Sequence, residues 1–278
     1  MKKYLKKIVS FLVANDGVWA FFSQQIVPFV EYAKRKRRAK DQLVIEHTDE
    51  VLHRISPCKV VLHGPFKGMM YPEFRSFGSS LVSKILGCYE KELHPLFERI
   101  KNNDYSSIVD IGSAEGYYAI GLARLFPTAE VFAFDTNSEA LNFCRQMARS
   151  NRVEDRLETG GFCTTERLKN LNLGNKALIV SDCEGFEKEL FTGQLVDSLS
   201  AHDFLIEVHD YIDIEISTNL RQVFSKTHDI VFIQSIDDIQ KALTYGYPEL
   251  LGYCLADRKM LLAEYRPSIM EWFYFSPK

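Results

Sequence analysis

The strongest constraint on the fold is a glycine-containing stretch, Val109–Tyr118, which reads VDIGSAEGYY. β-Branched residues precede it, and helical periodicity follows over 118–126. Gly112 and Gly116 allow the backbone to turn sharply and to approach a ligand closely. The stretch therefore predicts a strand, a cofactor-binding turn and a helix in succession.

The spacing within this turn discriminates between cofactors. A dinucleotide-binding loop needs G-x-G-x-x-G, so that a pyrophosphate can sit at the helix N-terminus. Here the spacing is D-x-G-x-x-x-G, and Glu115 stands where that phosphate would lie. S-adenosylmethionine carries no phosphate, so the turn favours a class I methyltransferase over a nicotinamide-dependent dehydrogenase. The residues expected to contact the cofactor here are Asp110, Gly112, Ser113, Ala114, Glu115, Gly116 and Tyr117.

A second strand is predicted over 131–134 and ends in Asp135. A carboxylate at this distance from the glycine turn can accept hydrogen bonds from both ribose hydroxyls. The alternative for Asp135 is an N-cap of the helix expected from Ser138 onward. Thr136, Phe162 and Asp182 complete the predicted cofactor site. Many class I enzymes have an acidic residue for the adenine amino group near Phe162, which here can only stack or offer backbone atoms.

Strands and helices alternate along the rest of the chain, which predicts an α/β fold. Further helices are expected over 138–151 and 186–191, and further strands over 156–159, 177–181, 204–209, 230–233 and 272–275. The pattern predicts a Rossmann-like class I methyltransferase fold, in which a mostly parallel sheet of about seven strands carries helices on both faces. An N-terminal helical region is expected in addition.

Charge divides the chain into a basic arm and an acidic body. Residues 1–40 hold ten basic and two acidic side chains, whereas the whole chain has a net charge of −3. The domain boundaries that we expect are a basic amphipathic helical arm over 1–41, a cap or substrate region over 42–104, and a cofactor-binding catalytic domain over 105–278.

The basic arm has two interpretations that stay open. It is either a peripheral membrane or partner-binding helix pair, or a helical cap that packs on the enzyme's own body. No apolar run approaches the roughly 18–20 residues of a membrane span, and no secretory cleavage pattern is present. We therefore expect a cytoplasmic protein, either free or peripheral on the inner face of the membrane. Nucleic acid is a less favoured partner, because no aromatics interleave with the run Lys34–Lys40.

The region between the arm and the glycine turn supplies candidate acceptor-binding residues. A short hairpin is expected over 59–71, followed by helices over 79–86 and 90–100. The substrate candidates are Lys67, Tyr71, Lys84 and Tyr89, together with Glu184 farther along the chain.

Three titratable residues lie at the carboxyl ends of two strands that come one after the other in the predicted fold. Asp182 comes directly after the strand over 177–181, and Glu207 and His209 share one face of the next strand. If the two strands pair, the three side chains converge above the cofactor's methyl group. They are the candidate catalytic residues and also the candidate metal ligands.

In order and spacing, four segments resemble the FkbM-type S-adenosylmethionine-dependent methyltransferases. These segments are Asp110–Tyr118, Phe132–Asp135, Asp182–Glu187 and Ile206–His209. The resemblance covers about residues 105–275. It implies O-methylation of a hydroxyl group, often on a sugar of a surface polysaccharide or on a natural product, with a saccharide or glycolipid as the acceptor.

Methyl transfer to a hydroxyl group requires removal of its proton. Either His209 or Asp182 acts as a general base, or a divalent ion such as Mg²⁺ or Mn²⁺, held by the three catalytic candidates, acidifies the hydroxyl. Other classes remain: an RNA or protein methyltransferase that uses the basic arm, or a cofactor-binding scaffold without catalysis. No N/D-P-P-Y/F tetrapeptide follows the strand over 177–181, which argues against methylation of base amino groups.

Overall fold

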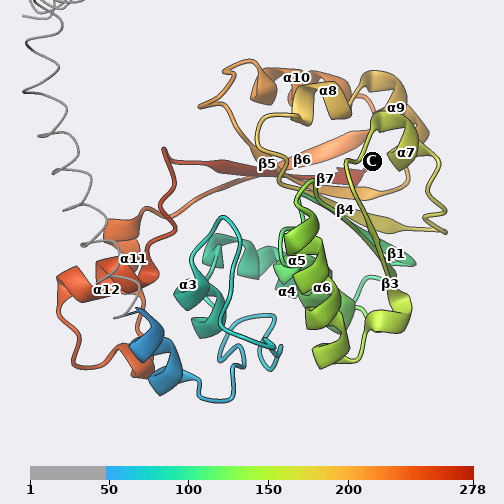
Figure 1. Cartoon of the computed structure of the whole chain (residues 1–278). Helices are drawn as coiled ribbons and strands as arrows, with labels where there is room; N and C mark the ends of the chain where they lie inside the picture. Colours follow the sequence, from blue (N-terminus) through green and yellow to red (C-terminus); the bar gives the residue numbers. More distant parts are fainter. Residues whose placement is uncertain (1–47) are drawn as a thin grey trace, which may run out of the picture. The chain divides into compact units, whose positions relative to one another are not determined.

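The computed structural model describes residues 48–278, and residues 52–278 form one compact unit. Its centre is a sheet of seven strands in the order β3-β2-β1-β4-β5-β7-β6 (Figure 1). The strands are β1 (Ser107–Ile111), β2 (Glu130–Phe134), β3 (Leu157–Gly160), β4 (Ala177–Ser181), β5 (Asp203–Val208), β6 (His228–Gln234) and β7 (Glu271–Pro277). Strands β1 to β5 run parallel, whereas β7 lies antiparallel between β5 and β6.

The central strands are mostly apolar because both faces of the sheet are covered. Every residue of β1, β4 and β5 is buried, as expected for parallel strands between two helical layers. On one face lie α7 (Thr165–Lys169), α8 (Glu187–Leu190), α9 (Gly193–Ser198) and α10 (Ile216–Phe224). On the other lie α4 (His94–Ile100), α5 (Tyr117–Leu125) and α6 (Ser138–Asn151). The predicted α/β fold with a mostly parallel seven-stranded sheet is confirmed.

The segment before β1 packs against elements from the far C-terminal part of the chain. The expected hairpin forms around an antiparallel bridge between Val60 and Met70, and α3 (Leu81–Leu86) follows it. Ser83 Oγ in α3 donates a hydrogen bond to the carbonyl of Leu262, at 3.4 Å. That residue ends α12 (Leu255–Leu262), which packs on α11 (Asp238–Thr244). Lys84 of α3 and Glu264, which lies just after α12, both line one cavity.

One helix was expected over 90–100, but two elements occupy this range. A 3₁₀ helix, η1 (Lys91–Leu93), is followed by α4, which begins at His94 with Pro95 in its first turn. Proline is favoured at the start of a helix because it has no N–H to donate. Two further 3₁₀ helices are η2 (Glu154–Arg156) and η3 (Pro248–Leu250).

The basic arm over 1–41 lies outside the described residues. Its contact with a membrane or with a partner through residues 1–40 stays a prediction, as do the three domain boundaries. Within residues 48–278, no helix is long and apolar enough to cross a membrane.

Candidate functional site

The turn between β1 and α5 is held in place by the neighbouring strand. Gly112 has φ +82°, and a Cβ atom there would lie 1.7 Å from the carbonyl oxygen of Asp182. Gly116 has φ +90°, and a Cβ atom there would lie 2.6 Å from Cys144 Sγ. Both glycines are therefore required by packing within the protein, as well as by the backbone conformation.

Asp135, at the end of β2, ties this turn to the start of α6. Its Oδ2 accepts a hydrogen bond from Ala114 N at 2.7 Å, and its Oδ1 accepts one from Asn137 N at 2.7 Å. Asn137, rather than Asp135, caps α6, since its side chain accepts from the first backbone N–H groups of that helix. Each carboxylate oxygen of Asp135 keeps a lone pair for a ligand, as a ribose-binding role requires.

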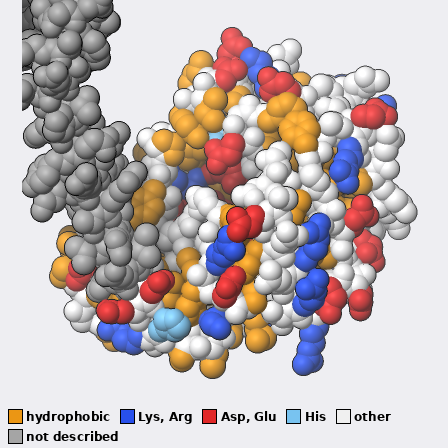
Figure 2. Space-filling model, in the orientation of Figure 1, with side chains coloured by type: hydrophobic (Ala, Val, Ile, Leu, Met, Phe, Trp, Pro, Cys, Tyr) orange, Lys and Arg blue, Asp and Glu red, His pale blue; other side chains and the backbone are white. Residues whose placement is uncertain are grey.

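A cavity of about 420 Å³ opens at the carboxyl ends of β1, β2, β4 and β5. Ligands of open α/β sheets bind at this edge. Figure 2 shows acidic and basic side chains around a hollow near the middle of the described surface. The predicted cofactor residues that line the cavity are Gly112, Ser113, Ala114, Tyr117, Asp135, Thr136, Phe162 and Asp182.

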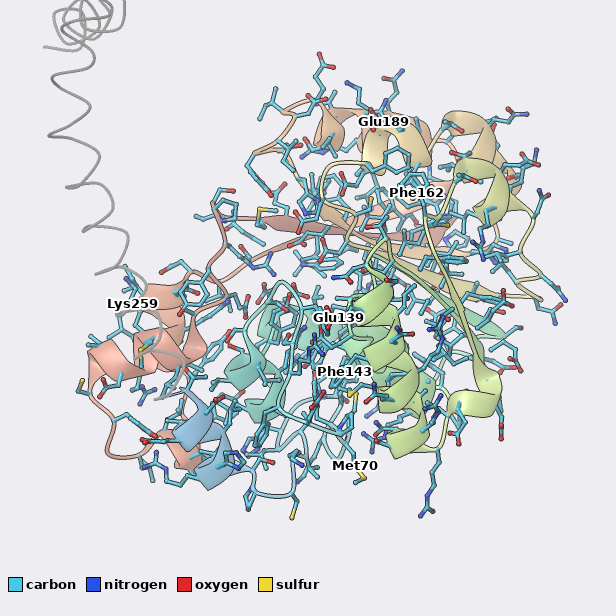
Figure 3. The ribbon with its side chains drawn as sticks, in the orientation of Figure 1. Met70, Glu139, Phe143, Phe162, Glu189 and Lys259 are labelled. Atoms are coloured by element: carbon cyan, nitrogen blue, oxygen red, sulfur yellow. The ribbon has the colours of Figure 1, made fainter. Side chains whose placement is uncertain are left out.

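Phe162 lies in the loop after β3 and is labelled in Figure 3. About half of its side chain is exposed, and its ring centroid lies 5.0 Å from that of Phe186, another residue of the cavity wall. A half-exposed aromatic ring beside the Asp135 end of the cavity is available to stack on an adenine base.

Three predicted cofactor residues do not line the cavity: Asp110, Glu115 and Gly116. Asp110 is buried and accepts a hydrogen bond from Ala119 N at 2.8 Å, and burial raises its pKa to about 7. Glu115 is fully buried and accepts hydrogen bonds from Lys84 Nζ (2.5 Å) and Ser76 Oγ (2.7 Å). Its place in the chain suggested a ligand contact, but its side chain binds α3 and the segment before that helix instead.

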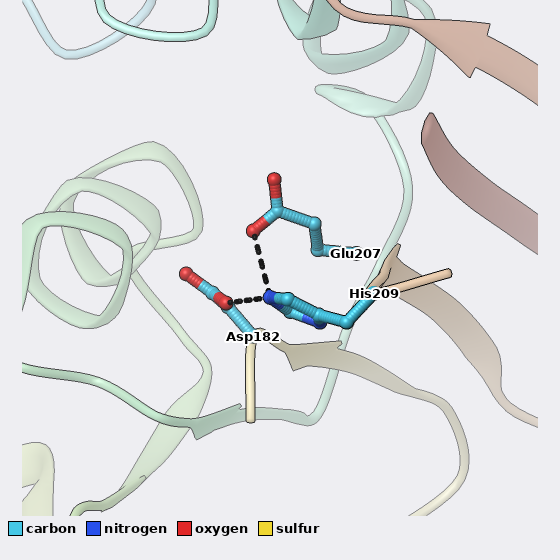
Figure 4. Close-up of side chains that lie close together, drawn as sticks. All are labelled: Asp182, Glu207 and His209. Carbon is cyan, nitrogen blue, oxygen red and sulfur yellow. Dashed lines mark ion pairs between the residues drawn. The ribbon is translucent and has the colours of Figure 1, made fainter. Parts of the chain in front are cut away.

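The three catalytic candidates converge as predicted (Figure 4). His209 Nε2 lies 3.3 Å from Asp182 Oδ1 and 3.7 Å from Glu207 Oε2. All three residues line the cavity, and one potential ligand atom from each lies within 4.8 Å of the others. The spacing of these residues in the sequence does not by itself bring them together. The side chains meet because β4 and β5 pair in parallel.

The orientation of His209 is fixed from behind by Glu187 in α8. His209 Nδ1 lies 2.6 Å from Glu187 Oε1, and the Glu187 side chain is fully buried. This contact fixes the imidazole so that Nε2 faces the cavity. A carboxylate behind a histidine is a feature of general-base sites and of metal sites alike.

Arg266 is a member of the site that the sequence analysis missed. It lies in the loop between α12 and β7, and its guanidinium contacts Glu207 directly. It also pairs with Glu90 at 2.5 Å and with Glu264 at 3.1 Å. A largely buried guanidinium surrounded by three carboxylates compensates much of their mutual repulsion and holds Glu207 in one orientation.

The electrostatics of the cluster favour a proton on His209 in the ligand-free protein. Burial opposes protonation, but hydrogen bonds to Asp182 and Glu187 and their negative charges outweigh it and raise the pKa of His209 to about 10. Burial, followed by the charge of Asp182, raises the pKa of Glu207 well above its ordinary value. Burial also opposes ionisation of Asp182, yet hydrogen bonds from His209 and Glu207 leave its pKa lowered.

The substrate candidates divide into two groups. Lys84, Tyr89 and Glu184 line the cavity, whereas Lys67 and Tyr71 do not. Lys67 is exposed on the hairpin, and Tyr71 is buried in the core. Tyr211, Tyr265 and Met270 line the cavity as well, but the sequence offered no signal for them.

Comparison with known proteins agrees with this geometry. A family model described as a methyltransferase domain matches residues 102–159, which contain β1, the glycine turn, α5, β2 and α6. No curated protein sequence matches the chain significantly. The glycine turn, Asp135, the sheet order and this match define a class I methyltransferase whose cofactor is S-adenosylmethionine.

Several solved structures are similar over most of their length. An rRNA methylase from Streptococcus thermophilus has 15% identity and a TM-score of 0.46, with 67% of this chain and 96% of that chain covered. A precorrin-6y C5,15-methyltransferase from Geobacter metallireducens has 14% identity and a TM-score of 0.44, with 66% and 85% covered. TYW2 from M. jannaschii in complex with AdoMet has 13% identity and a TM-score of 0.39, with 71% and 80% covered. These likenesses are too distant to carry an argument about the acceptor.

The role of Asp135 gives a first testable prediction. Asp135→Ala should weaken the binding of S-adenosylhomocysteine by about 10- to 100-fold, because hydrogen bonds to a charged group are worth about 1.5–3 kcal/mol. Calorimetry measures this directly. Glu139→Gln is the matched control, because Glu139 is an exposed carboxylate at the start of α6 (Figure 3) and does not line the cavity. Equal affinity in Asp135→Ala and the unaltered protein would remove Asp135 from the site.

Proposed function

We propose that this protein transfers the methyl group of S-adenosylmethionine to a hydroxyl group on a sugar of a polysaccharide or glycolipid. The observation that carries the proposal is the cavity-facing Nε2 of His209, which lies between Asp182 and Glu207 and is oriented by Glu187. The resemblance to FkbM-type enzymes supports the choice of a sugar hydroxyl. A cytoplasmic location, free or peripheral on the inner membrane face, is part of the same proposal.

The reaction is an in-line displacement at the methyl carbon. The acceptor oxygen forms a bond to the methyl carbon, the carbon–sulfur bond breaks, and its electron pair stays on sulfur to give S-adenosylhomocysteine. The acceptor's proton has to leave as the bond forms, because a sugar hydroxyl is a weak nucleophile at neutral pH. Neutral His209 is placed at the cavity wall to accept it, with Glu187 stabilising the imidazolium that results.

A divalent cation is the second arrangement that the cluster supports. Asp182, Glu207 and His209 offer two carboxylates and one imidazole with convergent atoms, and Glu187 is the carboxylate partner that metal-bound histidines commonly have. Mg²⁺ or Mn²⁺ is the kind of ion that such an oxygen-rich set prefers. It would acidify the acceptor hydroxyl.

Chelation and pH separate the two arrangements. If His209 acts as the base, EDTA should leave turnover unchanged. The rate at subsaturating acceptor should then rise about tenfold per pH unit from pH 7 to 9, because a residue with a pKa of about 10 is mostly protonated in that range and only its neutral form accepts the proton. If a metal is used, EDTA should abolish turnover, and Mn²⁺ or Mg²⁺ should restore it.

The acceptor class can be tested by label transfer. The protein is incubated with methyl-labelled S-adenosylmethionine and separate carbohydrate, RNA and protein fractions from its source cells. We expect label in the carbohydrate fraction that resists mild alkali, because methyl ethers survive conditions that hydrolyse methyl esters. The His209→Gln variant is the control for adventitious labelling. Enzyme-dependent label in RNA or protein alone would contradict the sugar acceptor while leaving the methyltransferase class intact.

A further inference from the structure

The cavity wall beside the glycine turn contains a polar group without a partner. Ser113 is 5% exposed and lines the cavity, and its Oγ has no hydrogen-bond partner within the described part of the chain. Buried hydroxyl groups almost always have a partner, so an unpaired one at a cavity wall indicates a ligand atom. Ser113 lies just before α5, whose first residue, Tyr117, lines the same wall.

Lys84 from α3 lies at the same wall. Its ammonium group donates hydrogen bonds to Glu115 Oε1 at 2.5 Å and to Ser76 Oγ at 3.2 Å. It also lies 5.0 Å from the ring centre of Tyr89 and 5.4 Å from that of Tyr117, both of which line the cavity. An ammonium group has three hydrogens, so one remains for a ligand.

The other cations of the wall are more fully engaged by the protein. Arg266 is held by three carboxylates, and His209 contacts both Asp182 and Glu187. Lys84 has only one carboxylate partner, Glu115. Of the cations that line the described cavity, Lys84 is therefore the best placed to take a second negative charge.

S-adenosylmethionine has three parts, and the adenosine and the reactive methyl group already have assigned positions in the cavity. Asp135 and Phe162 mark the adenosine end of the cavity, and Asp182 with His209 marks the position of the reactive methyl group. The remaining part is the α-amino-carboxylate of the methionyl tail. Its carboxylate is repelled by the acidic residues elsewhere on the wall, which leaves the Ser113 and Lys84 side.

We propose that Lys84 and Ser113 bind the α-carboxylate of the methionyl tail of S-adenosylmethionine. The N-terminal end of α5 adds a favourable dipole at this position. Glu115 neutralises Lys84 when no cofactor is bound, so that the buried ammonium never lacks a counter-charge. Lys84 is thereby a cofactor-binding residue rather than an acceptor-binding one. The proposal rests on the cofactor and is independent of the acceptor.

Two ligands that differ only in the tail test the proposal. S-adenosylhomocysteine carries the amino-carboxylate, whereas 5′-methylthioadenosine lacks it. Calorimetry should show that Ser113→Ala weakens S-adenosylhomocysteine binding several-fold and that Lys84→Met weakens it at least tenfold. The affinity for 5′-methylthioadenosine should stay within twofold of that of the unaltered protein, because this ligand does not reach either side chain.

Loss of Lys84 alone leaves the buried Glu115 unpaired, so the double variant Lys84→Met, Glu115→Gln keeps the test independent of folding. The double variant removes both charges together. It should lose affinity for S-adenosylhomocysteine and keep its affinity for 5′-methylthioadenosine. Lys67→Met is the matched control, because Lys67 is an exposed lysine of the same region outside the cavity. Equal weakening of both ligands, or unchanged S-adenosylhomocysteine affinity in Ser113→Ala and the double variant, would overturn the proposal. Failure of the unaltered protein to bind either ligand would instead contradict the cofactor assignment.

Discussion

His209→Gln is expected to lower turnover by about 100-fold or more while S-adenosylhomocysteine affinity changes little. A general base contributes about 10²- to 10⁴-fold, and the amide of glutamine cannot accept a proton at neutral pH. If the metal arrangement holds, the loss should be similar, because one of three ligands disappears. Turnover is measured with the acceptor identified by label transfer, and calorimetry reports the cofactor affinity.

Asp182→Asn and Glu207→Gln should each lower turnover to a similar extent. His63→Gln is the matched control, since His63 pairs with Glu249 and does not line the cavity. Glu187→Gln tests the orienting contact separately, and we expect it to shift the pH dependence of turnover to lower pH, because loss of a carboxylate lowers the pKa of His209. Normal turnover in the His209, Asp182 and Glu207 variants would assign these three residues a purely structural role.

Gly112→Ala should abolish cofactor binding and lower the melting temperature. The left-handed backbone costs an alanine about 1–3 kcal/mol, and overlap of the new methyl group with the Asp182 carbonyl adds a comparable amount. Gly112→Val should be more severe still. Because the strained atoms belong to the two turns that form the cofactor site, the effect on binding should exceed the effect on stability.

Gly252→Ala separates the two causes. Gly252 also has a positive φ, +86°, but a Cβ atom there meets nothing within 4 Å, and the residue does not line the cavity. The Gly252→Ala variant should therefore show only the stability loss that comes from the backbone conformation and keep its affinity for S-adenosylhomocysteine. If Gly112→Ala behaved like Gly252→Ala in both measurements, close packing of the turn against Asp182 would not be what the site requires.

The central strands β1, β4 and β5 were predictable from the sequence because burial on both faces makes them mostly apolar. The strand over 177–181 was placed at its observed limits, and the others shifted by at most a few residues. The convergence of Asp182 with Glu207 and His209 followed from the assumption that their strands pair. The local sequence was therefore enough to predict the strands of the sheet and the three central residues of the candidate site.

Contacts between distant segments were not predictable in the same way. Arg266 binds Glu207 across 59 positions, and Lys84 binds Glu115 across 31. A single charged residue in a loop carries no periodicity, so nothing local distinguishes it from a solvated surface charge. For the same reason, the sequence did not show that Glu115 pairs with a residue of α3. Its place in the turn suggested a ligand contact instead.

β7 lies inside the sheet although it follows all the other described strands in the sequence. It pairs with both β5 and β6, and Arg266 lies in the loop that leads into it. During synthesis on the ribosome, β5 therefore has an open edge and β6 has no partner strand until residues 271–277 have emerged. Glu207 lacks its counter-charge until Arg266 has emerged. A chain truncated before residue 266 would therefore lose both an interior strand and the cation that pairs with Glu207.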